Sequence, residues 1–223
     1  MTDPQLRELI LQELDYEPGV RSDHLDVTVG QGEVTLLGSV ESYYQRMAAE
    51  RAARRISSTR LVINELIVEL PVRDQVCDPE LARTIVQVLR QCSTFPRDSV
   101  RATVRNGYVT LHGTVDWHYQ RRAVVSVVEQ LRGVRGLCSR IWLRTAGTPP
   151  EDVRSRIVTA LQRQYAPAPE HIHLELVGGR ATLTGHVETG CDREEMVSAV
   201  WRAPGIIQVE DRLEVIPTAA VAA

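Results

Sequence analysis

The sequence contains no lysine and a single phenylalanine among its 223 residues, and it has no long apolar run. A membrane-spanning helix needs about 18 or more consecutive apolar residues with few or no charges, so we expect no integral membrane segment. Residues Met1 to Ile10 lack the basic start and the apolar stretch of a signal peptide. We therefore expect a cytoplasmic protein, for which the accessible bilayer is the inner face of the membrane.

Signatures of metal, disulfide and catalytic chemistry are also missing. The four cysteines, Cys77, Cys92, Cys138 and Cys191, show no Cys-x-x-Cys spacing, which disfavours a zinc ribbon or a disulfide framework and favours reduced thiols. No Gly-x-Ser-x-Gly, P-loop or His-Glu-x-x-His motif occurs. We expect a protein that is not an enzyme and carries no cofactor. All 26 basic residues are arginine, which indicates genome composition first and phosphate recognition second.

What the sequence does contain is a repeat. The segments 32–40, 107–115 and 179–187 read GEVTLLGSV, GYVTLHGTV and GRATLTGHV, at offsets of 75 and 72. The same offsets hold without a gap over 63 residues, from 6 to 68, 81 to 143 and 153 to 215. The chain is therefore built from three copies of one unit.

Each unit opens with apolar residues at helical spacing, such as Leu6, Ile10 and Leu14 in the first. Two alternating segments follow, separated by Gln31-Gly32, Asn106-Gly107 or Gly178-Gly179, pairs typical of a two-residue hairpin turn with positive φ. Alternation predicts that Leu36, Leu111 and Leu183 are buried. It also places Gly38, Gly113 and Gly185 on the helix-covered side, where the missing side chain would allow close helix approach.

A second helical segment (45–56, 120–131 and 192–201) and a final alternating strand complete each unit. The fold class is α+β: three tandem α-β-β-α-β domains, each a three-stranded mixed sheet with two helices on one face. We expect domains at residues 1–70, 78–144 and 150–217, with linkers at 71–77 and 145–149 and a tail at 218–223.

These features resemble the BON (bacterial OsmY and nodulation) domain family. The resemblance rests on the Val-Thr-Leu-x-Gly-x-Val strand, the alanine-rich second helix of the first unit, the Gly133-Val134 and Gly205-Ile206 pairs before the last strand, and Asn64 within it. It implies bacterial phospholipid or envelope association, a part in osmotic or other stress responses, and no catalysis. The first unit departs from the pattern at Thr59-Arg60, where a Gly-Val pair is expected, and the missing signal sequence argues against a periplasmic role.

Charge is divided unevenly between the units. Residues 1–75 hold 8 arginines against 13 acidic residues, residues 76–147 hold 11 against 5, and residues 148–223 hold 7 against 11. The net charges are therefore −5, +6 and −4. A basic middle unit suits an anionic bilayer, where each basic residue contributes about 1 kcal/mol. It equally suits docking against its own acidic neighbours.

The start of the second helix holds the candidate lipid or anion contacts. Aromatic residues lie beside arginines there in two units, and a helix N-terminus can bind phosphate while Trp and Tyr suit the headgroup layer. Ser42 with Gln45 also forms a capping-box pattern, and such aromatics often pack a helix onto its sheet. The candidates are Trp117, Tyr119, Arg121, Arg122, Tyr43, Tyr44 and Arg46.

Two weaker signals concern other ligands. If Gly178-Gly179 is the turn, His171 lies opposite His186, and His173 shares their face, so three imidazoles could meet a metal, although we expect no bound ion. Gly133-Val134-Arg135-Gly136 matches Gly-x-x-Gly, but it joins a helix to a strand, whereas a KH loop joins two helices, so nucleic acid is not expected. The sequence favours peripheral binding to anionic phospholipid. The alternative is a protein-protein scaffold built from the repeated domains, and the oligomeric state stays open.

Overall fold

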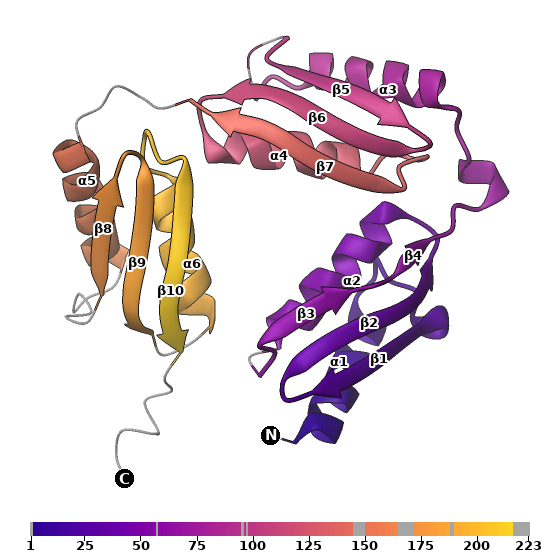
Figure 1. Ribbon diagram of the computed structural model, residues 1–223, viewed down its shortest axis with the longest axis horizontal. Coiled ribbons are helices and arrows are strands. Elements are labelled where there is room, and N and C mark those ends of the chain that lie inside the picture. The colour runs from indigo at the N-terminus through magenta and orange to yellow at the C-terminus, as the bar shows by residue number, and fades with distance from the viewer. Residues whose placement is uncertain are drawn as a thin grey trace. The chain divides into compact units, whose positions relative to one another are not determined.

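The computed structural model describes residues 2–56, 58–94, 96, 98–144, 150–164, 172–187 and 190–215. They form three small sheets, each accompanied by two helices in the order α-β-β-α-β (Figure 1). The predicted fold class, three tandem α+β domains, is confirmed.

The first domain comprises α1 (Asp3–Tyr16), β1 (Leu25–Gly30), β2 (Glu33–Val40), α2 (Tyr43–Arg55), β3 (Leu61–Asn64) and β4 (Ile67–Val68), with short 3-10 turns at Ser22–His24 and Val72–Asp74. β2 is central: it pairs antiparallel with β1 and parallel with β3 and β4. The last strand is therefore divided in two. The division follows Asn64, whose side-chain oxygen accepts the Leu66 N–H at 3.2 Å.

The other two domains repeat this order with an undivided last strand. The middle domain comprises α3 (Asp78–Gln91), β5 (Val100–Arg105), β6 (Tyr108–Val115), α4 (His118–Glu129) and β7 (Gly136–Leu143). The third comprises α5 (Pro150–Gln164), β8 (His173–Val177), β9 (Arg180–Val187), α6 (Gly190–Trp201) and β10 (Gln208–Val215). Their sheet orders are β5-β6-β7 and β10-β9-β8, so the second strand of the hairpin is central each time.

The core of each domain lies between the sheet and its two helices. Leu36, Leu111 and Leu183, at equivalent positions of the central strands, are 1%, 0% and 0% exposed, which confirms the predicted alternation. In the first domain, Leu6, Ile10 and Leu14 of α1 and the alanines of α2 complete the cluster. Because both helices cover one face, alternate residues of every strand point from the other, open face of the sheet.

The hairpin turns adopt the expected backbone. Gln31 and Gly32 have φ of 53° and 78°, and Asn106 and Gly107 have 54° and 79°. The first residue of the preceding helix holds each turn, a contact that the sequence did not reveal. Asp78 accepts the N–H groups of Asn106 and Gly107 at 2.7 and 2.9 Å, and Asp3 does the same for the first turn.

The glycines in the central strands serve a purpose different from the predicted one. Gly38, Gly113 and Gly185 have φ of 112°, 153° and 135°, a region that side chains disfavour. A Cβ at Gly38 would overlap the carbonyl oxygen of His24, which precedes β1, and one at Gly113 would overlap that of Ser99. Gly38 and Gly113 therefore allow the start of the neighbouring strand, and not a helix, to approach closely.

Candidate functional site

The aromatic residues predicted at the start of α4 lie together. The rings of Trp117 and Tyr119 have centroids 6.5 Å apart, and Tyr119 is 57% exposed. Arg122 is exposed, while Trp117 and Arg121 are partly exposed. An aromatic pair and two guanidiniums at one helix end can contact a phosphate and the apolar layer next to it.

Gln120, which the sequence analysis did not single out, fixes this helix start. Its side-chain oxygen accepts the N–H groups of Asp116 and Trp117, both at 3.0 Å, and its amide donates to the carbonyl of Thr94. Only 7% of its surface is exposed. The sequence could have revealed this residue, because Gln120 occupies in the middle unit the position that Gln45 occupies in the first.

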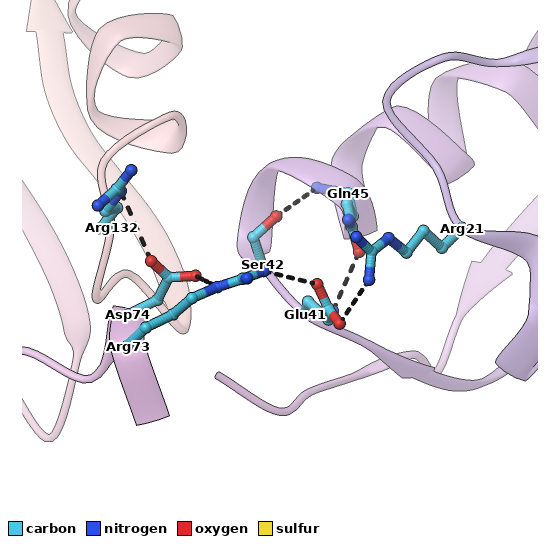
Figure 2. Close-up of polar contacts among 7 residues, drawn as sticks. All are labelled: Arg21, Glu41, Ser42, Gln45, Arg73, Asp74 and Arg132. Atoms are coloured by element: carbon cyan, nitrogen blue, oxygen red, sulfur yellow. Dashed lines mark hydrogen bonds and ion pairs between the residues drawn. The ribbon is translucent and has the colours of Figure 1, made fainter. Parts of the chain in front are cut away.

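The equivalent start of α2 is an N-cap, as the Ser42 and Gln45 pattern predicted. Ser42 Oγ accepts the Gln45 N–H at 3.2 Å, and the Gln45 side chain accepts the Glu41 N–H at 3.0 Å (Figure 2). Figure 2 also shows Glu41 paired with Arg21 at 2.8 Å and Arg73 at 3.7 Å. The start of α4 has a carboxylate at the same register, Asp116, which pairs with Arg144 at 3.3 Å, so an acid lies beside both helix starts.

The candidates of the first domain have structural contacts. Tyr44 packs over Gly19, where a Cβ would lie 2.9 Å from the tyrosine ring, and Tyr43 packs against the core. The Arg46 guanidinium donates to the backbone oxygen of Asn64 at 2.9 Å and to its side-chain oxygen at 3.4 Å. This arginine therefore ties the second helix to the last strand.

The third domain has the same kind of hydrogen bond between its second helix and its last strand, and the middle domain lacks it among the described residues. Arg193, at the register of Arg46, donates to Asp211 at 2.7 Å, and Asp211 stands where the first domain has Asn64. In the middle domain the corresponding residues are Arg121 and Ser139. Among the described residues, Arg121 makes no hydrogen bond or ion pair. Its donors are therefore available to a ligand.

Two of the three histidines predicted to share a face, His173 and His186, lie among the described residues. His173 pairs with Thr184 across the β8–β9 hairpin, which is the predicted register, and the His186 Nδ1 lies 3.7 Å from a Glu214 carboxylate oxygen. His171 lies outside the described residues. No group of three metal-ligating side chains occurs in the part of the chain that the structure describes.

A search of the described helices finds none with the length and apolar character that a membrane span requires.

Comparisons with known proteins identify relatives. The family model described as BON domain matches residues 2–69, 78–141 and 151–217. An uncharacterized protein in the gshII 5' region of Anaplasma centrale is 24% identical over 132 residues, which are 58% of this chain and 87% of that protein.

Solved structures of CdsD, a structural protein of the type III secretion system of Chlamydia trachomatis, also align. One, of the C-terminal domain, covers 97% of this chain and 100% of that chain at 13% identity, with a TM-score of 0.27. The other covers 97% and 95% at 14% identity, with the same TM-score. No functional argument follows from so low a TM-score.

Proposed function

Because this chain belongs to the BON domain family, which its sequence matches in three consecutive segments, we propose that it is a non-enzymatic binding protein of anionic phospholipid surfaces. The middle domain makes the contact, peripherally and reversibly, at the inner face of the membrane. The family resemblance adds a role in osmotic or envelope stress.

The observation that carries the proposal is that the Arg121 guanidinium, which lies over the Trp201 ring at 5.5 Å, has no hydrogen-bond or ion-pair partner among the described residues. In the first and third domains the equivalent arginine is hydrogen-bonded to the last strand, at Asn64 and Asp211. Ser139 replaces the side-chain acceptors of Asn64 and Asp211 in the middle domain. A guanidinium forms strong, charge-assisted bonds with phosphate oxygens, and Arg121 is positioned to do so beside Arg122 at the same helix start.

Two further features support a lipid surface as the ligand. Tyr119 and Trp117 lie next to these arginines, and amphipathic aromatic rings favour the headgroup layer. The middle domain also carries 11 arginines against 5 acidic residues. Attraction between exposed charges is screened over ~8 Å at physiological ionic strength, so binding weakens as salt is added.

The test is co-sedimentation of the full chain with vesicles of phosphatidylcholine containing increasing phosphatidylglycerol. Reversal of two arginines, Arg121→Glu with Arg122→Glu, is expected to weaken binding roughly hundredfold or more, since each basic residue contributes about 1 kcal/mol. The matched control is Arg83→Glu with Arg90→Glu on α3, which alters the same charge on exposed residues elsewhere. Equal pelleting of parent and Arg121/Arg122 variant would reject the site, and a parent that ignores anionic vesicles at low salt would reject the function.

A further inference from the structure

The open face of the middle sheet is basic and aromatic. Its outward positions are Arg101, Thr103 and Arg105 on β5, Tyr108, Thr110, His112 and Thr114 on β6, and Cys138, Arg140 and Trp142 on β7. None of these residues is acidic. Trp142 is 75% exposed and Tyr108 is 60% exposed. We call this surface the basic face.

Its charges have no partner among the described residues. None of the arginines Arg101, Arg105 and Arg140 makes an ion pair or a side-chain hydrogen bond with any residue that the structure describes. Tyr108 lies over Gly136, where a Cβ would come within 2.6 Å of its ring. Tyr108 and Trp142 stand toward opposite ends of this face, with three unpaired guanidiniums on the same face, so a partner that is both acidic and partly apolar suits it.

The open face of the first sheet has the complementary composition. Its outward positions are Asp26, Thr28, Gly30, Glu33, Thr35, Leu37 and Ser39 on β1 and β2, and Leu61, Ile63, Glu65, Ile67 and Glu69 along the last strand. No basic residue is among them. Ile67 is 62% and Leu61 is 49% exposed. We call this surface the acidic face.

The acidic face also has unpaired charges. Asp26 is bound by Arg7 at 3.1 Å, but Glu33, Glu65 and Glu69 have no ion pair among the described residues. Three unpaired carboxylates thus stand among exposed aliphatic side chains. On the basic face, three unpaired guanidiniums stand among exposed aromatic side chains.

The third sheet is a weaker candidate for either face, because it carries both signs of charge, Arg180 and Arg212 with Glu175, Glu210 and Glu214. Arg212 is bound to Glu210 at 2.6 Å on β10, and His186 on β9 lies 3.7 Å from Glu214. Its open face therefore has neither the excess of one sign nor the cluster of aliphatic or aromatic side chains that the other two have.

From this complementarity we infer that the chain binds a second copy of itself, with the basic face of one copy packed on the acidic face of the other. Two open sheets pack face to face about 10 Å apart, with interleaved side chains. The interface is heterologous, because it joins different surfaces of the two copies. In such a pair one copy keeps its acidic face unused and the other keeps its basic face, so association either closes into a ring or continues.

The contact is small. A three-stranded face of eight-residue strands spans roughly 14 by 26 Å, which is about half the area that each partner contributes to a standard interface. Association is therefore weak, increases with protein concentration and falls as salt is added. The inference does not depend on lipid binding, because no residue of either face belongs to the helix start that holds Arg121.

Sedimentation velocity of the full chain over a wide concentration range tests the inference. The basic-face variant carries Arg101→Glu with Arg140→Glu, and the acidic-face variant carries Glu33→Arg with Glu65→Arg. Each alone is expected to weaken self-association at least roughly tenfold, because like charges then oppose each other. The Arg83→Glu with Arg90→Glu control should associate as the parent does.

A mixture of the two variants provides the decisive measurement. The reversed basic face of one is complementary to the reversed acidic face of the other, so mixing should restore association that neither shows alone. Circular dichroism verifies that both fold. A parent that stays monomeric at low salt, variants that associate like the parent, or a mixture that stays monomeric would each overturn the inference. If the monomeric parent binds anionic vesicles or single-stranded nucleic acid through Arg101 and Arg140, the basic face serves an anionic ligand instead.

Discussion

Gly38 shows how one residue type can be required by the path of the backbone. Its φ of 112° and the closeness of the His24 carbonyl leave no room for a Cβ. We expect Gly38→Ala to lower the free energy of unfolding by about 3 kcal/mol or more, from backbone strain combined with overpacking. Gly30→Ala is the control, because a Cβ there would meet nothing within 4 Å. Equal melting temperatures for the two variants would contradict this explanation.

Asp78 is a second residue whose role is local. Its carboxylate accepts both N–H groups of the Asn106-Gly107 turn. Replacing Asp78 with Ala is expected to destabilise the middle domain by about 1 to 2 kcal/mol and to accelerate hydrogen exchange at those two amides. Glu80→Ala removes an acid from the same helix turn without touching the hairpin and should leave their exchange unchanged. Unaltered protection in Asp78→Ala would mean that the turn holds its shape without the carboxylate.

At the scale of elements, the middle domain differs from the other two because its described residues lack the hydrogen bond between the second helix and the last strand. Ser139→Asn would supply Arg121 with the acceptor that Arg46 has in Asn64, without adding a charge. The occupied guanidinium should lower affinity for anionic vesicles roughly fivefold, about 1 kcal/mol for one basic residue. Ser139→Ala, which adds no acceptor, should bind as the parent does. Identical vesicle affinity in both variants would remove Arg121 from the lipid site.

The order and register of the elements could be predicted from the sequence because period and repetition encode them. Alternation identified Leu36, Leu111 and Leu183, and the threefold register aligned every hairpin. Contacts across elements could not be predicted in this way. Asp78 binds a turn 28 residues away, and Arg193 binds Asp211. Both hydrogen bonds depend on how the helices cross the sheet, which periodicity does not specify.

At the scale of the whole molecule, the basic middle domain presents two surfaces. Its open sheet face carries Arg101 and Arg140, while Arg121 and Arg122 belong to a helix, and both helices cover the opposite side of the sheet (Figure 1). For a net charge of +6 between domains of −5 and −4 we therefore propose two uses, one toward phospholipid and one toward the acidic face of another copy. Both are electrostatic, so salt alone cannot separate them.

Neutral substitutions can separate the two uses. Arg101→Gln with Arg140→Gln should reduce self-association in sedimentation and leave most vesicle binding intact, because the helix start is unchanged. Arg121→Gln with Arg122→Gln should do the reverse. Both pairs remove the same charge, so an effect of net charge alone would lower the two activities equally in both variants. That equal loss would show that the middle domain acts as a diffuse positive charge without two distinct surfaces. Opposite losses would assign lipid to the helix start and the second copy to the sheet, since exposed charges farther apart than ~8 Å interact little at physiological salt.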